Sequence, residues 1–239
     1  MVCLDRKQEV WSALNAVTDP EIDESVVSLD FVTAVKVDSD RVEIDFRLPT
    51  YWCAPNFAFL MASDMRDAVT ALEWVSEVSV KLFDHFSADL INRGVALRQD
   101  FRDAFPGETD DDLSSVRQKF LGKAFERRQE LLLRYLLAHG YSPDCIARAR
   151  LSELLHLQLD REGSSLRNLY LFILRRIKPD VEEEAPAFTT LEGMPLDSHD
   201  LKGYLRKIAA VRRNAEFNGF FCRSLLSERV KRSRSEIPT

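Results

Sequence analysis

Residues 48–61, LPTYWCAPNFAFLM, decide how the front of the chain folds. The preceding residues 41–48 alternate apolar and polar side chains, which is typical of a half-buried strand. This strand runs into a loop that is bracketed by two prolines and contains Cys53. From Asn56 onward, apolar residues recur at three- and four-residue spacing, so the sequence predicts a helix with Asn56 as its N-cap. One thiol therefore lies in a strand-to-helix loop, just ahead of a helix start.

Cys53 is the first candidate functional residue. The free amides and the macrodipole at a helix N-terminus favour a thiolate, which is the form of cysteine that binds metal or attacks a substrate. The alternative is that Cys53 is a small hydrophobic residue between Trp52 and Phe57, since free cysteine is among the most often buried residues. Position alone leaves both interpretations open.

Length and composition are those of a globular protein. The chain has 239 residues, of which 45% are apolar, enough for one large domain or two modest ones. No run approaches the roughly 20 apolar residues of a membrane span, and charged residues interrupt the N-terminus where a signal peptide would be apolar. The sequence therefore predicts a cytoplasmic protein without membrane association.

Charge is distributed unevenly along the chain. Residues 1–82 carry 7 basic and 15 acidic side chains, a net charge of −8, so the remainder carries +2 of the total of −6. An acidic front disfavours nucleic acid and is compatible with docking on a basic protein. The arginine-rich end of the chain lacks the concentrated excess of positive charge that nucleic-acid binding requires. We therefore expect no nucleic-acid partner.

The front of the chain predicts a small α+β domain. A short amphipathic helix over residues 9–17 ends before the turn that begins with Asp19 and Pro20. The runs 26–37 and 41–48 predict a hairpin, and Phe31, Thr33, Val35 and Val37 are expected on one face of its first strand. The helix after Cys53 and a third strand over 75–82 follow. This order predicts an α-β-β-α-β two-layer domain over residues 1–84.

The rest of the chain, residues 85–239, predicts a mostly α-helical domain, which we interpret as the region that recognises a client. Its strongest helix covers residues 116–139 and is closed by Gly140. The acidic, proline-containing residues 180–195 predict a loop or mobile linker. Further helices are expected over residues 144–150, 151–159, 166–177, 198–213 and 215–229, with a frayed basic tail after them.

Three motifs give the front of the chain a family resemblance. They are DPEI at residues 19–22, VVSLDFV at residues 26–32 and PTYWC at residues 49–53. Together they resemble the MIP18 family, also called the DUF59 domain, over about residues 7–82. The family is a small α+β unit with a DPE motif and a reactive cysteine shortly after a Pro-Thr strand end. The matching positions are Asp19, Pro20, Glu21, Pro49, Thr50 and Cys53.

The resemblance implies a function in metal-centre assembly. The family includes iron–sulfur assembly proteins of the SUF type, accessory proteins of phenylacetate oxygenase and a subunit of the eukaryotic cytosolic iron–sulfur targeting complex. It implies a non-enzymatic maturation factor with Cys53 as the ligand of iron or a transient iron–sulfur cluster. The helical remainder resembles longer versions associated with bacterial di-iron monooxygenases. The expected partner is therefore a client metalloprotein, such as an oxygenase component.

Other side chains can complete a site around Cys53. A carboxylate of Asp19 or Glu21 could serve as a hard ligand or tune the thiol, although acids at such a turn usually only cap it. His85, at the exit of the third strand, is a further candidate ligand. The expected metal site is therefore Cys53, Asp19, Glu21 and His85, while Pro49, Thr50 and Asn56 belong to the surrounding motif.

The cysteine pattern limits what kind of metal site the chain can form. Cys3, Cys53, Cys145 and Cys222 lie far apart, with no C-x-x-C pair. One cysteine is too few for a four-thiolate cluster, so bound metal should be labile or shared with the client or across a homodimer. Cys222, in NGFFCRSLL, is either a core residue or the best remote partner of Cys53 if the helical region folds back.

Two functions from other classes stay open. The chain could be a thiol-dependent enzyme with Cys53 as nucleophile and His85 as base, which requires the two within hydrogen-bond reach. It could also be an architectural adaptor in which Cys53 is only a core residue. With no glycine-rich phosphate loop in the sequence, we infer no nucleotide-driven step.

Overall fold

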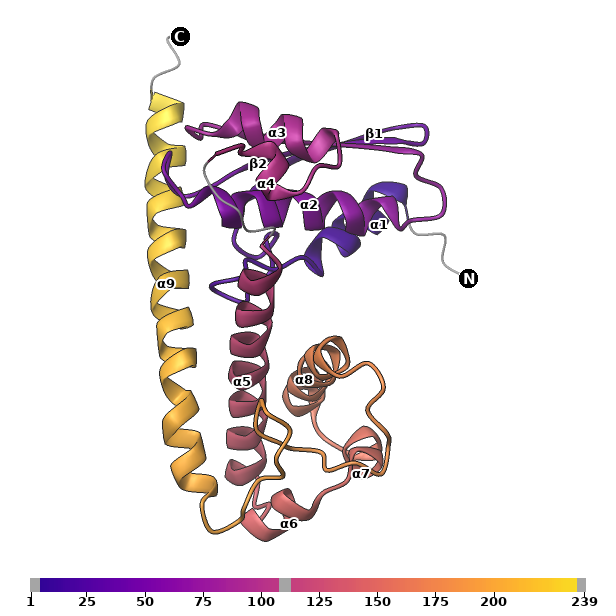
Figure 1. The fold of residues 1–239 in the computed structure, drawn as a ribbon, viewed down its shortest axis with the longest axis vertical. Helices are drawn as coiled ribbons and strands as arrows, with labels where there is room; N and C mark the ends of the chain where they lie inside the picture. Colours follow the sequence, from indigo (N-terminus) through magenta and orange to yellow (C-terminus); the bar gives the residue numbers. More distant parts are fainter. Residues whose placement is uncertain (1–4, 108–112, 236–239) are drawn as a thin grey trace. The chain divides into compact units, whose positions relative to one another are not determined.

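The computed structural model of the chain describes residues 5–107 and 113–235 (Figure 1). It divides into two compact units, one made of residues 1–116 and 215–239 and the other of residues 117–214. Within the described residues, no helix is both long enough and apolar enough to cross a membrane. The elements are α1 (Arg6–Asn15), β1 (Val32–Asp38), β2 (Arg41–Arg47), α2 (Pro55–Thr70), β3 (Glu77–Phe83), α3 (Ala88–Ala96), α4 (Phe101–Ala104), α5 (Ser114–Ala138), α6 (Pro143–Arg148), α7 (Leu151–His156), α8 (Arg161–Ile177) and α9 (Leu201–Ser235).

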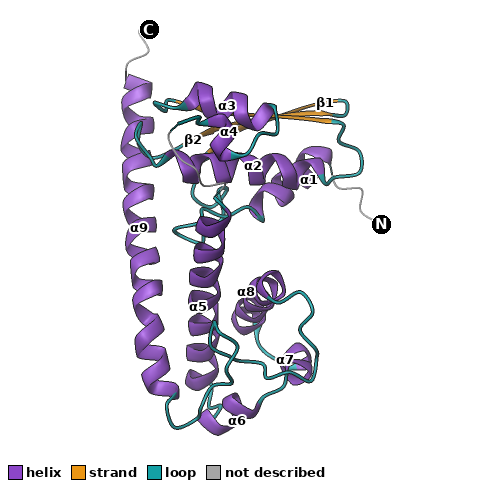
Figure 2. Cartoon of the chain, in the orientation of Figure 1, coloured by secondary structure: helices purple, strands orange, loops and turns teal. Residues whose placement is uncertain are grey.

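The first unit confirms the predicted α+β class and the order helix, strand, strand, helix, strand (Figure 2). Its sheet has the order β1-β2-β3, with β1 antiparallel to β2 and β3 parallel to β2. A parallel neighbour needs a crossover connection, and α2 supplies it. In β2 the alternating side chains Val42, Ile44 and Phe46 are buried, as the period-two pattern predicts for a half-buried strand.

The first strand differs from the prediction. It begins at Val32, and residues 26–30 form turns that are closed by bonds such as the one from the Phe31 amide to the Val26 carbonyl. A register shift between Val32 and Ala34 leaves Val32 buried and Thr33 exposed. The expected single face that includes Thr33 is therefore wrong, because a bulge interrupts the alternation that defines a face.

The helix after the Cys53 loop has its N-cap two residues earlier than predicted. Ala54 is its N-cap and makes no side-chain cap bond, and Pro55 occupies the first turn, where a missing amide costs nothing. The Asn56 side chain accepts a hydrogen bond from the Phe57 amide at 2.9 Å. Asn56 is thus a first-turn residue, and its assignment as N-cap is corrected.

The first unit extends beyond the expected boundary at residue 84. The Asn92 side chain of α3 bonds both the amide and the carbonyl of Leu82 in β3, as a neighbouring strand would. Phe101 and Phe105 pack edge-on against Phe59 of α2. Residues 85–107 and 113–116 therefore complete the core of the first unit, and the division of the structure differs from the predicted domains 1–84 and 85–239.

The described part of the second unit consists of helices and loops around a polar centre. Gln129 is fully buried and donates to the Thr189 carbonyl at 2.9 Å and the Tyr204 hydroxyl at 2.7 Å. Its side-chain oxygen accepts from the Tyr170 hydroxyl. Phe188 is buried as well. Residues 180–195 contain no helix, as predicted, but they pack into the core of this unit and are not a free linker.

Two helices in the second half of the chain differ from the predicted ones. Helix α8 begins at Arg161 rather than residue 166, because Asp160 caps it through a bond from the Gly163 amide at 2.8 Å. The two expected closing helices, 198–213 and 215–229, form the single helix α9. No proline or glycine separates them, so nothing in the sequence ends the helix there. Gly140 has a φ of 88°, as expected for the residue that closes α5.

Candidate functional site

The site is built at the edge of the sheet where two parallel strands end. Strand β2 leads into the Cys53 loop, and β3 leads into Asp84 and His85. The two strands stay in register to their last pair, Arg47 opposite Phe83. Since the carboxyl ends of parallel strands meet at one edge, the sheet itself brings the Cys53 loop and His85 together.

Hydrogen bonds fix the two loops to each other. The Phe86 amide donates to the Tyr51 carbonyl at 3.0 Å, and Nε2 of His85 lies 2.7 Å from the Cys53 carbonyl oxygen. The Ser87 amide donates to Nδ1 of His85 at 3.2 Å. Because Nδ1 accepts a hydrogen bond, it carries no proton, so Nε2 carries the ring proton and donates a hydrogen bond to the Cys53 carbonyl. His85 is therefore neutral in this arrangement.

The electrostatics of His85 agree with this assignment. Burial lowers the pKa of His85, and the charge of Arg229 lowers it further, while the bond to the Cys53 carbonyl acts in the opposite direction. Both ring nitrogens are engaged with the backbone. The expected role of His85 as a metal ligand is corrected to that of a positioning residue, because no lone pair is left for a metal.

The Cys53 thiol faces a hydroxyl group. Cys53 is half-buried, and its Sγ lies 3.1 Å from Oγ1 of Thr50. A hydroxyl can accept from a thiol or donate to a thiolate, so Thr50 can serve both forms of the sulfur. Pro49 is buried behind the loop. The motif Pro49, Thr50, Cys53 thus forms one local arrangement that presents a single sulfur atom.

The Asp19 turn is closed by its own side chain. Asp19 is only 7% exposed, and its Oδ1 accepts from the amides of Glu21 at 2.8 Å and Ile22 at 2.9 Å. Burial raises the pKa of Asp19 to about 6, against the effect of these two bonds. The Glu21 side chain is exposed. Asp19 acts as the cap of its turn, which was the structural alternative for this motif.

Sequence reasoning missed Arg229. This residue belongs to the part of α9 that lies in the first unit. Its guanidinium donates to the Leu48 carbonyl at 2.8 Å and to the Asp84 carbonyl. These two carbonyls directly follow the ends of β2 and β3, and the chain separation of 181 residues explains why no local pattern indicated the contact. A weak signal was present, since Cys222, Leu226 and Arg229 share a helical spacing.

Cys222 lies in the same unit and packs against the same hydrophobic cluster as Cys53. Burial raises the pKa of Cys222 to about 11, and the charges of Asp19, Cys53 and Glu21 add to this effect. The structure therefore places the remote thiol in the same unit as the Asp19 turn and the Cys53 loop.

The expected four-ligand metal site is not assembled. Among residues 5–107 and 113–235, no three histidine, cysteine, aspartate or glutamate side chains are grouped so that they could hold a metal ion. His85 uses both nitrogens, and Asp19 uses an oxygen to close its own turn. The proposed set of Cys53, Asp19, Glu21 and His85 is thus corrected. Cys3 lies outside the described residues.

Residues 7–81 match the family model described as an iron-sulfur cluster assembly protein. The matched segment contains Asp19, Glu21, Thr50 and Cys53, and it ends before His85 and the helical remainder. A search of curated proteins finds no match to the chain. The match supports a role in iron–sulfur cluster assembly in general.

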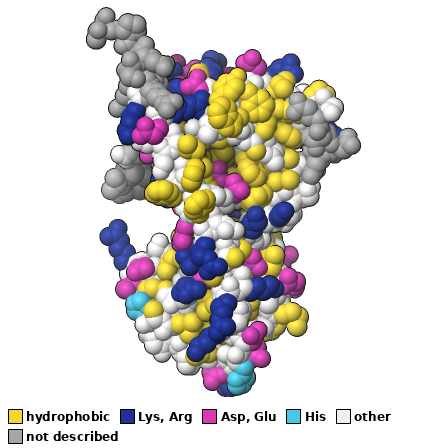
Figure 3. Space-filling view, turned by 90° about the vertical axis from the view of Figure 1, so that its left-hand side faces the viewer, with side chains coloured by type: hydrophobic (Ala, Val, Ile, Leu, Met, Phe, Trp, Pro, Cys, Tyr) yellow, Lys and Arg dark blue, Asp and Glu magenta, His cyan; other side chains and the backbone are white. Residues whose placement is uncertain are grey.

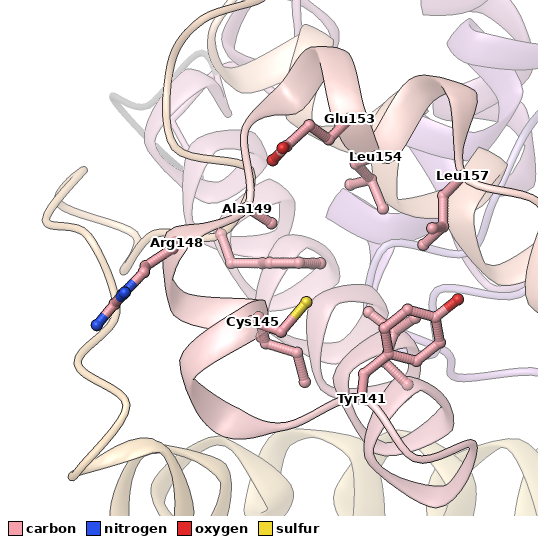
Figure 4. Close-up of a pocket in the computed structure, with 10 residues that line it drawn as sticks. Tyr141, Cys145, Arg148, Ala149, Glu153, Leu154 and Leu157 are labelled. Carbon is pink, nitrogen blue, oxygen red and sulfur yellow. The ribbon is translucent and has the colours of Figure 1, made fainter.

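A cavity in the second unit is separate from this site. It has a volume of about 280 Å³ and is lined mainly by apolar side chains, with the Cys145 sulfur pointing among them (Figure 4). Glu153 on its wall is engaged, since its carboxylate accepts from the Arg150 amide at 2.7 Å. The Arg148 side chain extends away from the other lining residues in this view. The described residues give this cavity no pair of acid and base.

Proposed function

We propose that the chain is a non-enzymatic accessory factor that assists the assembly of an iron or iron–sulfur centre in a client metalloprotein. Cys53 is the thiolate that contacts the cargo. One observation carries this proposal. A free thiol, with a hydroxyl 3.1 Å away, sits in a loop that two strand ends hold in place, inside the segment that matches an iron–sulfur assembly family.

The geometry favours a carrier over a thiol enzyme. Nε2 of His85 contacts the carbonyl of Cys53, and Nδ1 accepts a hydrogen bond from the Ser87 amide rather than from the thiol. A general base must be within hydrogen-bond reach of the proton that it abstracts. Since the Sγ of Cys53 has Thr50 as its neighbour, the pair that nucleophilic catalysis requires is not supported.

The cargo is held transiently. A cluster with four thiolate ligands needs more donors than the Cys53 loop offers, and the described residues contain no group of three ligands. The client, or a second copy of this chain in a homodimer, supplies the missing ligands. Weak attachment suits delivery, because a carrier must release what it binds.

Exposed aromatic side chains next to Cys53 provide a docking surface for the client. Trp52 is 74% exposed, and Tyr51 and Phe86 are exposed beside it with ring centres 6.4 Å apart. Hydrophobic side chains gather over the first unit in the upper part of Figure 3, with acidic side chains among them. Large exposed apolar patches mark sites of protein association.

The client that we propose is a bacterial di-iron monooxygenase, and the helical part of the chain recognises its oxygenase component. The resemblance of the front domain to the MIP18 type and the additional helical region support this choice. The protein acts in the cytoplasm, without nucleic acid or membrane.

Anaerobic reconstitution with iron and sulfide tests the proposal. Wild type, Cys53→Ala and, as a matched control, Cys145→Ala are compared by metal analysis and visible absorption. We expect uptake by wild type and Cys145→Ala and loss in Cys53→Ala. Activation of a co-expressed di-iron oxygenase should follow the same order, and unchanged activation by Cys53→Ala would refute the proposed function.

A further inference from the structure

One face of the C-terminal part of α9 packs on the Cys53 site. Gly219, Cys222, Leu226 and Arg229 follow one another at three- and four-residue spacing, which places them on one side of a helix. Leu226 is 4% exposed and belongs to the hydrophobic core of the first unit. This face therefore belongs to the packed interior of the domain that carries Cys53.

The helix is fixed next to the Asp19 turn by one residue before Cys222 and one directly after it. A Cβ atom at Gly219 would lie 3.1 Å from Cγ2 of Ile22 and 3.2 Å from Oε1 of Glu24, so the missing side chain permits a close approach. Arg223 forms an ion pair with Glu24 at 2.6 Å. Both contacts fall within five residues of Asp19.

The same face is fixed to the strand ends after Cys222. The Arg229 guanidinium binds the carbonyls of Leu48 and Asp84, which flank the two loops that meet at Cys53. Cys222 lies between these attachments, one helical turn before Leu226. The helix is therefore held on both sides of the position from which Cys222 faces the domain.

The position of Cys222 suits a metal ligand. Cys222 is half-buried and packs against the hydrophobic cluster that Cys53 also contacts. Thiolates are soft ligands that thiophilic metal ions prefer, and a thiol that binds such an ion loses its proton.

We propose that Cys222 is the second thiol of the Cys53 site, so that the Cys53 loop and α9 together hold one thiophilic metal ion of the cargo through two sulfur atoms. The inference rests on the proposed function and deepens it. Two thiolates are the share of one iron in a [2Fe–2S] cluster with four cysteine ligands. The cargo or the client then supplies the remaining ligands, in agreement with the absence of a three-ligand group among the described residues.

Titration of the reduced full-length chain with Co²⁺ under anaerobic conditions tests this inference. Thiolate-to-cobalt charge transfer absorbs in the near ultraviolet, and its intensity grows with the number of bound thiolates. The variants are Cys222→Ser, Cys53→Ser and the control Cys145→Ser, each checked for its fold by circular dichroism. Loss of an outer-sphere partner alone weakens metal sites by about 10- to 100-fold, so loss of a direct ligand should cost at least as much.

We expect Cys222→Ser to bind Co²⁺ at least about tenfold more weakly than wild type, with roughly half of the charge-transfer intensity at saturation. Cys145→Ser should match wild type. Binding that is lost in Cys53→Ser but unchanged in Cys222→Ser overturns this inference and leaves the proposed function intact. Binding that is unchanged in both variants overturns both.

A second measurement does not depend on metal. Dibromobimane becomes fluorescent only when it joins two nearby thiols, and peptide mapping identifies the thiols that it joins. We expect a bridge between Cys53 and Cys222 in the native chain and its loss after unfolding. Labelling of each thiol by separate reagent molecules in the native chain, with no bridge, would also overturn the inference.

Discussion

The imidazole of His85 holds Cys53 by its backbone carbonyl, while the Cys53 sulfur contacts the Thr50 hydroxyl. Nε2 donates to the Cys53 carbonyl at 2.7 Å, while Nδ1 accepts from the Ser87 amide. A histidine between two loops is thus used to fix the place of a thiol, and the parallel pairing of β2 with β3 makes this possible. The groups that act on the thiol are therefore the Thr50 hydroxyl and any ligand that binds at the site.

Replacement of His85 should loosen the Cys53 loop. His85→Ala removes the Nε2 donor and leaves the Ser87 amide without its acceptor, so we expect a loss of about 1–3 kcal/mol in the free energy of unfolding. Alkylation of Cys53 in the native chain should be faster. His199→Ala, which changes an exposed histidine, is the control. An unchanged rate of Cys53 alkylation in His85→Ala would contradict the positioning role.

The contribution of His85 should depend on pH. Its pKa is lowered in the folded chain, so the unfolded chain binds the proton more readily. The stabilisation is complete above the ordinary value of about 6.5 and declines as the pH falls below it toward the lowered pKa. The difference in unfolding free energy between wild type and His85→Ala should therefore shrink between pH 7 and pH 5. A difference that grows on acidification would contradict this assignment.

Asp19 should destabilise the folded chain at neutral pH. Its pKa rises from 3.8 to about 6 on folding, so the folded chain favours the protonated carboxyl. Stability is present below pH 3.8 and is lost as the pH rises through about 6, which amounts to about 3 kcal/mol by 1.36 kcal/mol per pKa unit. A buried carboxylate that lowers the free energy of unfolding by this amount is a candidate for a functional role.

Asp19→Asn tests this cost. Asparagine keeps an oxygen for the amides of Glu21 and Ile22 but cannot ionise, so the variant should be more stable than wild type above pH 7. The two should converge as the pH falls below about 4. Asp30→Asn, at an exposed position, is the control for the loss of one charge. The free energies of unfolding are measured by chemical denaturation between pH 4 and pH 8. If Asp19→Asn were less stable than wild type at pH 8, the ionised Asp19 carboxylate would not destabilise the folded chain.

Local periodicity predicted the elements of the site but not its assembly. The alternation of Val42, Ile44 and Phe46 and the spacing after Asn56 identified the strand and the helix around Cys53, and the position of His85 after the third strand pointed to the right edge. Arg229 could not be found in this way, because a contact across 181 residues leaves no periodic trace.

The prediction failed at two further points for physical reasons. The bulge next to Val32 places Thr33 on the exposed side, whereas Val35 is buried as predicted, because the additional residue interrupts the alternation locally. The predicted set of metal ligands was wrong because the sequence does not show which polar side chains form hydrogen bonds with the backbone. His85 and Asp19 are polar and lie at turns, yet their hydrogen bonds stabilise these turns.

Arg229 should attach the end of α9 to the sheet. Arg229→Ala removes donors to the carbonyls of Leu48 and Asp84, and we expect a loss of about 2–4 kcal/mol, since bonds from charged donors are worth about 1.5–3 kcal/mol each. Amide hydrogen exchange should increase in residues 215–229, and Cys222 should be alkylated faster. Lys231→Ala, which loses only an exposed pair with Glu228, serves as the control. Equal exchange in the two variants would exclude this role.

Gln129 should be the residue on which the second unit depends most. It is fully buried and serves four hydrogen bonds, two as donor and two as acceptor. Gln129→Leu keeps the side-chain size but leaves the amide and carbonyl of Thr189 without this partner, and each buried unsatisfied group costs about 1–3 kcal/mol. We expect a loss of about 2–5 kcal/mol on thermal or chemical unfolding.

The matched control for this last change is Gln158→Leu, at an exposed glutamine in the same unit. It should change the free energy of unfolding by less than about 0.5 kcal/mol, as surface substitutions do. If Gln129→Leu were as stable as Gln158→Leu, the buried network would contribute no net stability, and residues 180–195 would be held by the packing of Phe188 and by backbone bonds such as the one from the Ala187 amide to the Ala149 carbonyl. Phe188→Ala would then be the more damaging change, because it opens a cavity in the core of this unit.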